Sequence, residues 1–150
     1  MNHEYYMKVA LEEARKAYEK NEVPVGAVLV KDNKIIASAY NTREQDQSAL
    51  GHAEILVIKK ANEILQSWRL DSCSLYVTIE PCQMCSGAII QSRIENVYYG
   101  ATDLKSGAHQ SILNLYEFPF NHKVNVESGI LEKECSELMT SFFKKLRIKD

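Results

Sequence analysis

The chain has 150 residues, of which 45% are hydrophobic and 25% are charged, and its formal net charge is −2. This composition predicts one compact domain over residues 1–150, and the small negative charge argues against a protein that binds nucleic acid through overall basicity. Its four cysteines do not require a disulfide framework, and no apolar run reaches the length that spans a membrane.

The N-terminal segment predicts a helix over residues 3–20. Five small or apolar side chains have the spacing of one buried helical face: Tyr6, Val9, Ala10, Ala14 and Ala17. The opening residues Met1-Asn2-His3-Glu4 are charged and polar, unlike the basic and then apolar order of a signal peptide. We therefore expect a soluble, cytoplasmic protein in a reducing compartment, where Cys73 and Cys135 are small buried hydrophobic residues.

A β-hairpin is predicted next, from residues 25–30 and 35–40 joined by the polar turn Lys31-Asp32-Asn33-Lys34. Residues 41–51 are polar or small and predict a loop. This loop leads to a second helix, from His52 to about Gln66, which would cover the sheet with Ile55, Leu56, Ile58 and Leu65.

The remaining elements continue the alternation of strand and helix. Residues 75–79 predict a central strand that leads through Pro81 into a helix ending near Ser92. Residues 97–99 and 123–126 predict two more strands, and residues 131–145 predict the final helix. The pattern is typical of an α/β layer fold, and without an internal repeat or linker it indicates no second domain.

Three residues have the character of zinc ligands: His52, Cys82 and Cys85. The two cysteines are three residues apart directly after Pro81, which would place both sulfurs on one face of a first helical turn. The partial positive charge of a helix N-terminus favours thiolates. A zinc site with three protein ligands leaves its fourth position for water, so this set predicts a catalytic site.

Glu54 is the candidate general acid and base. It follows His52 by two residues, which is about 200° around a helix, so both side chains would not normally bind one metal. We interpret Glu54 as taking a proton from zinc-activated water while hydroxide attacks an amidine-like ring carbon. It would then deliver protons to the ring nitrogen and the departing amine. The paired histidines of a zinc peptidase are absent from the sequence.

A structural zinc site stays open as an alternative. Such a site would need a fourth ligand, for which the candidates are Cys73, Cys135, His109 and His122. Glu54 would then be a solvated surface residue.

The C-terminal segment also has two interpretations. Phe142 and Phe143 are followed closely by Lys144, Lys145 and Arg147. Aromatic and basic side chains together could stack a base and hold phosphates. They could equally be core aromatics and cations placed favourably at a helix C-terminus.

The order H-x-E and then P-C-x-x-C is the signature of zinc deaminases that act on nucleobases. Over nearly its whole length the chain resembles the cytidine-deaminase-like superfamily, and within it the bacterial tRNA-specific adenosine deaminases. The zinc motif alone would identify only the superfamily, whereas the Asp-x-Lys-x-Gly-Ala loop at residues 103–108 and the Phe-Phe-basic tail indicate the tRNA branch. Matching segments include 22–28, 41, 52–54, 75–81, 121–122 and 129–147.

The resemblance implies a three-layer α/β/α sandwich around a mixed five-stranded sheet. It implies hydrolytic conversion of the wobble adenosine in a tRNA anticodon stem-loop to inosine, with release of ammonia. The implied Zn²⁺ ligands, one ion per subunit, are His52, Cys82 and Cys85, with Glu54 as the proton shuttle. The implied protein is a cytoplasmic homodimer in which both subunits build each RNA site. Implied substrate contacts are Asn41, Ala53, Asp103, Lys105, Asn121, His122, Phe143, Lys144 and Arg147.

Two segments depart from the family pattern, Ala49-Leu50-Gly51 and His109-Gln110. Both flank the expected substrate mouth and leave the zinc ligands unchanged. Two other functions stay open: a deaminase of a free base, with guanine as the leading case, and a non-catalytic, zinc-stabilised RNA-binding module.

Overall fold

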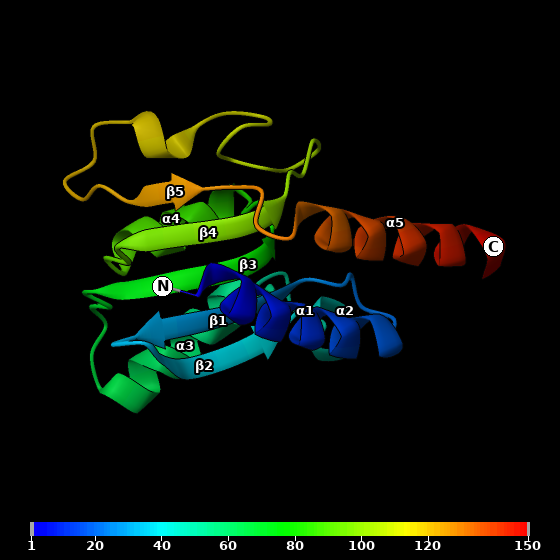
Figure 1. The fold of residues 1–150 in the computed structure, drawn as a ribbon, viewed down its shortest axis with the longest axis horizontal. Helices are drawn as coiled ribbons and strands as arrows, with labels where there is room; N and C mark the ends of the chain where they lie inside the picture. Colours follow the sequence, from blue (N-terminus) through cyan, green and yellow to red (C-terminus); the bar gives the residue numbers. More distant parts are fainter. Residues whose placement is uncertain (1, 150) are drawn as a thin grey trace.

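The computed structural model describes residues 2–149, so Met1 and Asp150, the ends of the expected domain, lie outside the described residues. The structure contains one five-stranded sheet and helices on both sides of it (Figure 1). In chain order the elements are α1 (His3–Glu19), β1 (Gly26–Lys31), β2 (Lys34–Tyr40), α2 (Arg43–Asp46), α3 (Ala53–Leu65), β3 (Cys73–Ile79), α4 (Gln83–Gln91), β4 (Asn96–Ala101), the 3₁₀ helix η1 (Leu115–Glu117), β5 (Asn125–Glu127) and α5 (Glu132–Lys149).

The strand order is β2-β1-β3-β4-β5, and the sheet is mixed. β1 pairs antiparallel with β2 and β3, while β3 pairs parallel with β4 and β4 with β5. Every residue of β3 is buried, as expected for an apolar strand covered on both faces. The predictions of a β1–β2 hairpin and of a central strand at residues 75–79 are confirmed.

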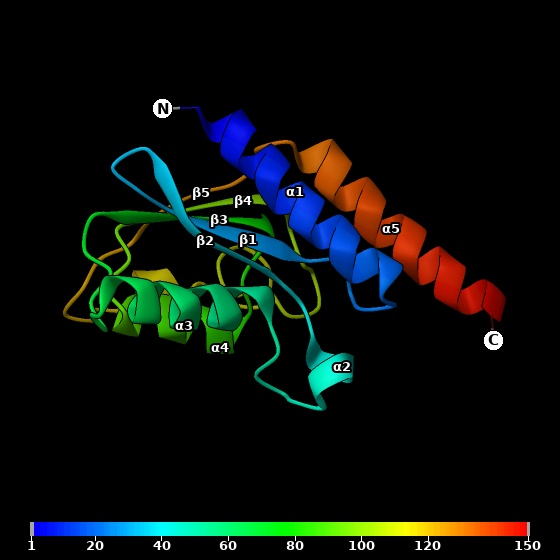
Figure 2. The same ribbon diagram turned by 90° about the horizontal axis from the view of Figure 1, so that it is seen from below.

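The helices form two layers. α1 and α5 lie side by side on one face of the sheet, and α3 and α4 cover the other face (Figure 2). Tyr18 of α1 contacts Phe142 of α5 ring to ring, with centroids 5.7 Å apart. The predicted three-layer α/β/α architecture is confirmed.

Small residues let the helices approach the sheet closely. Ala10, Ala14 and Ala17 of α1 are fully buried, and a Cβ atom placed on Gly26 of β1 would overlap the carbonyl oxygen of Ala10. This close backbone contact requires glycine at the start of β1.

The buried face of α3 differs in part from the prediction. Its buried residues include Ala53, Val57, Ile58 and Ala61. Of the expected residues, Ile58 is buried, and Leu56 and Leu65 are partly buried and pack against the core, whereas Ile55 is partly buried without packing there. The apolar residues of this helix extend around more than one side, so the apolar pattern alone did not determine which side faces the sheet.

Other differences concern short segments and boundaries, including the following four. The expected loop at residues 41–51 contains α2, η1 was not predicted, β5 begins two residues later, and α5 continues four residues beyond Lys145. Cys73 and Cys135 are buried free thiols, as predicted. Within residues 2–149, no helix combines the length and apolar character needed to cross a bilayer.

Candidate active site

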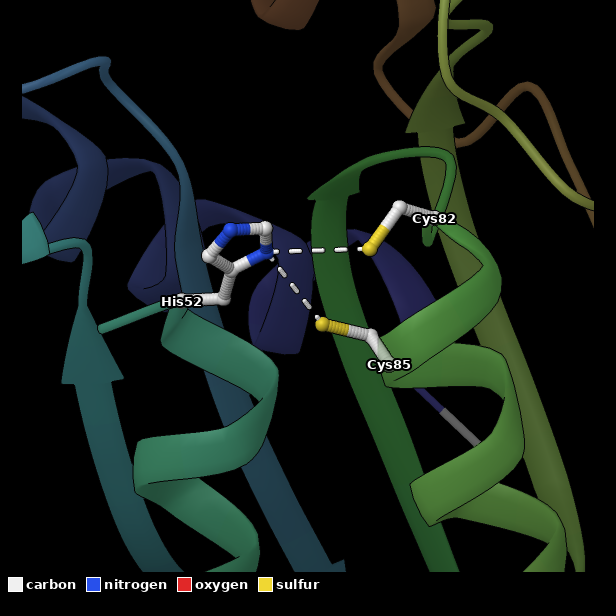
Figure 3. Close-up of side chains that lie close together, drawn as sticks. All are labelled: His52, Cys82 and Cys85. Carbon is white, nitrogen blue, oxygen red and sulfur yellow. Dashed lines mark hydrogen bonds between the residues drawn. The ribbon is translucent and has the colours of Figure 1, made fainter. Parts of the chain in front are cut away.

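The three predicted zinc ligands converge between the N-termini of α3 and α4. His52 is the N-cap residue of α3, Cys82 is the N-cap residue of α4, and Cys85 lies in the first turn of α4. Their side chains point toward one another (Figure 3). His52 Nδ1 lies 3.7 Å from Cys82 Sγ and 3.5 Å from Cys85 Sγ.

This geometry fits a zinc ion. A tetrahedral zinc with ordinary Zn–N and Zn–S bond lengths holds its nitrogen and sulfur ligands about 3.6 Å apart. The observed distances agree with that spacing, and the three ligand atoms lie within 4.8 Å of one another. One nitrogen and two sulfurs are also the donor types that zinc prefers.

The charges of the two thiols also favour a cation at this position. A hydrogen bond from Cys85 and a second from His52 lower the pKa of Cys82 to about 4. The same hydrogen bond and burial raise the pKa of Cys85 far above its usual value. The hydrogen bond with Cys82 also raises the pKa of His52. These opposite shifts disfavour ionisation of the second thiol, and a cation such as Zn²⁺ between the two sulfurs would favour it.

Glu54 lies in the first turn of α3 with only 4% of its surface exposed. Burial raises the pKa of its carboxyl group to about 7, and the nearby charge of Cys82 contributes to this shift. A carboxyl group with this pKa can both accept and release a proton near neutral pH. The alternative in which Glu54 is a solvated surface residue is therefore wrong.

The fourth ligand of a structural zinc site is not provided by the expected candidates. In the described part of the chain the group of side chains that could hold a metal ion consists of His52, Cys82 and Cys85. His109 Nδ1 instead hydrogen-bonds the hydroxyl group of Tyr99 at 2.7 Å, and His122 donates from Nε2 to a backbone carbonyl at 2.7 Å. The geometry corresponds to three protein ligands and one position for water.

A cleft of about 480 Å³ opens at the ligands and leads to the surface. Two cations line it, Arg43 of α2 and Lys105 of the loop after β4. The other lining residues are Ala49, His52, Cys82, Gln83, Met84, Ser106 and Ile112. Lys105 was predicted at this site, whereas Arg43 was missed because α2 was expected to be an irregular loop.

Asn41 fixes the start of α3. Its side-chain oxygen accepts a hydrogen bond from the backbone N–H of Ala53 at 2.8 Å, which satisfies one of the unpaired donors of the helix N-terminus. The N–H of Ala53 is thereby engaged within the protein. The amide nitrogen of Asn41 is a donor that this bond does not use.

Asp103 has a turn-forming role. Its carboxylate accepts hydrogen bonds from the backbone N–H groups of Lys105 and Ser106, at 3.2 and 3.3 Å. The side chain therefore shapes the loop that carries Lys105 to the cleft.

Asn121 and His122 lie at the other end of the sheet. His122 donates to the carbonyl oxygen of Ile94, which follows the C-terminus of α4, whereas the zinc ligands lie at the N-terminus of α4. The nine residues of α4 span about 13 Å. Within one chain, these two predicted RNA contacts and the zinc ligands are not brought together.

The predicted contacts of the tail lie on α5. Phe143 is 42% exposed, and Lys144 and Arg147 are also exposed. α5 lies on the face of the sheet opposite α3 and α4, and its C-terminal half extends beyond the sheet (Figures 1 and 2). These residues form a surface separate from the cleft in one chain.

Two buried carboxylates that the sequence analysis missed hold the loops of the cleft. Glu22, 2% exposed, accepts hydrogen bonds from the N–H groups of Glu44 and Gln45 at 3.0 and 2.7 Å. Glu80, also 2% exposed, accepts hydrogen bonds from the loop after β4. A glutamate between a largely apolar strand and Pro81 was the available signal for Glu80.

Known proteins resemble this chain in sequence and in structure. A family model described as MafB19-like deaminase matches residues 1–147. A tRNA-specific adenosine deaminase of Bacillus subtilis (strain 168) is 52% identical over 147 residues, covering 97% of this chain and 91% of the relative. A protein of the same name from Aquifex aeolicus (strain VF5) is 50% identical over 148 residues, covering 98% and 97%.

A solved structure agrees with this similarity. It comes from work described as "Biochemical and Structural Studies of A-to-I Editing by tRNA:A34 Deaminases at the Wobble Position of Transfer RNA". Its TM-score is 0.87 at 45% identity, over 89% of this chain and 98% of the other.

Proposed function

Because the chain belongs to the family of the tRNA-specific adenosine deaminases, we propose that it converts the wobble adenosine of a tRNA anticodon loop to inosine with release of ammonia. The reaction is a hydrolysis that replaces the amino group on the purine ring by oxygen. The observation that carries this proposal is the position of buried Glu54 beside Cys82 and Cys85, in a site where His52 and Cys82 line an open cleft.

His52, Cys82 and Cys85 would hold the zinc ion, which when bound activates water at neutral pH and stabilises negative charge on oxygen. Glu54 accepts the proton that water loses as it attacks the ring. It passes this proton to the ring nitrogen, then takes the second proton from the hydroxyl oxygen now bonded to the ring carbon and passes it to the amino group, which leaves as ammonia. Its buried position excludes bulk water and keeps its pKa close to the working pH.

Arg43 and Lys105 would bind the RNA backbone on either side of the cleft. An adenosine in a stem-loop has to leave the base stack before its ring can reach a buried site. Cations at the rim favour the phosphates of the flanking nucleotides, which stay outside. Asn41 is proposed to contact the inserted nucleoside with its side-chain amide nitrogen, beside the start of α3 that it caps.

We also propose a cytoplasmic homodimer. Asn121, His122 and the α5 residues Phe143, Lys144 and Arg147 lie away from the cleft of their own chain, so their proposed RNA contacts would be made at the cleft of a second copy. Exposed apolar side chains supply a surface for such a copy, among them Leu50, Leu104 and Ile112 in the segments that line the cleft, and Phe118 and Phe120 in the segment before Asn121. Sedimentation at several protein concentrations tests the dimer.

The reaction is tested by product analysis. Purified, zinc-loaded protein is incubated with an anticodon stem-loop carrying a wobble adenosine and, separately, with free guanine, adenosine and cytidine. We expect inosine at that single position and unchanged free bases and nucleosides. Xanthine from guanine together with unchanged RNA would move the activity to free bases, and no product from any substrate would favour a binding module.

A further inference from the structure

Glu80 is a buried carboxylate next to the zinc site that the reaction does not use. It lies between the last residue of β3, Ile79, and the Pro81-Cys82 segment, and only 2% of its surface is exposed. Its own N–H donates to the carbonyl oxygen of Ala101 at 2.8 Å, which fixes its backbone to the end of β4. Burying a carboxylate costs free energy unless it is fully hydrogen-bonded.

The carboxylate of Glu80 accepts five hydrogen bonds from one loop. Oε1 accepts from the N–H of Asp103 at 3.0 Å and from the hydroxyl group of Ser111 at 2.6 Å. Oε2 accepts from the N–H groups of His109, Gln110 and Ser111, at 2.9, 2.8 and 3.2 Å. The donors lie at both ends of segment 103–111, so one side chain holds both ends of this loop together.

The middle of the loop packs directly on the same carboxylate. A Cβ atom placed on Gly107 would overlap the carboxyl group of Glu80. Gly107 also forms an isolated antiparallel bridge with Cys82, and the N–H of Ala108 donates to the carbonyl oxygen of Pro81 at 2.9 Å. The loop is thus folded around Glu80 with no space for a larger residue at position 107.

Lys105 and Ser106 belong to this loop and line the cleft. We propose that Glu80 is a positioning residue, which fixes segment 103–111 so that the cationic wall of the cleft is ready to bind RNA. This inference rests on the proposed function. Because Glu80 acts on a wall of the cleft and Glu54 performs the proton transfer, loss of Glu80 weakens binding of the substrate and leaves the chemical step largely intact.

The first test compares Glu80→Ala with Glu13→Ala. Glu13 is also buried, at 7% exposed, but it lies on α1 and pairs with Lys16, so its removal controls for the loss of a buried carboxylate elsewhere. In Glu80→Ala we expect amide hydrogen exchange at positions 103 and 109–111 to become at least about tenfold faster. We expect KM for the stem-loop to rise about tenfold with kcat within about threefold of wild type.

Glu80→Gln supplies an intermediate change. Three backbone N–H groups donate to Oε2, so the side-chain oxygen of glutamine is expected to keep this position and its amide nitrogen to take the place of Oε1. There the hydroxyl group of Ser111 can rotate and accept a hydrogen bond from the amide. The N–H of Asp103 alone then loses its acceptor. We expect Glu80→Gln to recover most of the slow exchange at positions 109–111 and most of the wild-type KM. Full loss in this variant would contradict the hydrogen-bonding argument.

Gly107→Ala disturbs the same contact from the loop, and it remains informative if Glu80→Ala does not fold. Its methyl group displaces the carboxylate, so KM and amide exchange should rise as in Glu80→Ala. In the double variant the methyl group enters the space that the carboxylate has left. We therefore expect KM of the double variant to resemble that of Glu80→Ala, and a product of the two single effects would argue against a shared contact.

The outcomes separate this inference from the reaction itself. Unchanged exchange at positions 103 and 109–111 in Glu80→Ala overturns the positioning role, whatever the activity. A fall in kcat of Glu80→Ala with unchanged KM, at full zinc content, also overturns it. Equal changes of KM and of amide exchange in Glu13→Ala would overturn it as well. If wild-type protein deaminates no RNA, the proposed function fails, while the exchange measurements still test whether Glu80 fixes the loop.

Discussion

His52 Nδ1 lies 3.5 Å from Cys85 Sγ, a spacing that matches two ligands of one tetrahedral zinc ion. The two residues are 33 positions apart in the sequence and are brought together because α3 and α4 begin side by side. This relationship makes the metal content of the protein directly testable.

We predict that Cys85→Ala abolishes stoichiometric zinc binding. The remaining His52 and Cys82 would supply two ligands, and a stable protein zinc site requires at least three. Zinc content, measured by elemental analysis after dialysis against a weak chelator, should fall from one ion per chain to nearly none. Cys135→Ala is the matched control because this buried thiol lies outside the site, and equal zinc loss in the control would contradict the assignment.

Arg43 and Lys105 should each contribute to the salt dependence of RNA binding. Every phosphate contact that is lost reduces the slope of log affinity against log salt by about 0.7 to 1. We therefore expect Arg43→Ala and Lys105→Ala to lower the slope by about this amount each, as measured by titration of a labelled stem-loop between low and physiological salt. Lys59→Ala, on the exposed side of α3, should leave the slope unchanged.

Asn41 should have two separable roles. Asn41→Ala removes the acceptor for the N–H of Ala53, and we expect the free energy of unfolding to fall by about 1 kcal/mol. Asn41→Asp keeps an acceptor but removes the amide donor. The unfolding temperature of the aspartate variant should be close to that of the wild type. Its KM for the stem-loop should be higher than the wild-type KM, as in Asn41→Ala. Recovery of both properties would leave Asn41 with a capping role alone.

Stability should decrease in mild acid because of His109. Burial lowers the pKa of this histidine, against the opposing charges of Glu80 and Glu117. As pH falls below the unfolded-state pKa of about 6.5, the unfolded chain binds a proton first, so stability is lost until the lower folded-state pKa is reached. At higher pH both states are neutral and the effect disappears.

His109→Asn tests this pH dependence. The side-chain oxygen of asparagine can replace Nδ1 as the acceptor for the hydroxyl group of Tyr99, but it does not titrate. Denaturant unfolding at pH 7 and pH 5, with equal zinc, should show a smaller loss of stability in the variant than in wild type. An equal loss would mean that other groups cause the acid sensitivity.

The sequence predicted the cysteine pair and the central strand because their signals are local. Pro81, Cys82 and Cys85 lie within five residues, and residues 75–79 are mostly apolar. His52, 30 positions before Cys82, was predicted from the H-x-E motif. The loop geometry could not be predicted in this way, because it depends on hydrogen bonds between residues far apart in the sequence. The carboxylate of Glu80 accepts hydrogen bonds from residues up to 31 positions away. Glu22 accepts hydrogen bonds from two residues of α2 that lie 22 and 23 positions after it. Arg43 was missed for the same reason, since its place in the cleft depends on α2.

The direction of the apolar face of α3 was also beyond the local pattern. Ile55 is as apolar as Ile58, yet only Ile58 is buried. Packing against the sheet on one side and α4 on the other decides between them, and this depends on the complete fold.

Conversion of a wobble adenosine by zinc-loaded wild-type and Glu54→Gln protein tests the account most directly. The substitution keeps the shape of the side chain and removes its ability to carry a proton. We predict full zinc content and unchanged folding in the variant. Inosine formation should be slower than in the wild type by about 10²- to 10⁴-fold. A zinc-loaded Glu54→Gln variant that forms inosine at the wild-type rate would contradict the assignment of Glu54 as the proton carrier.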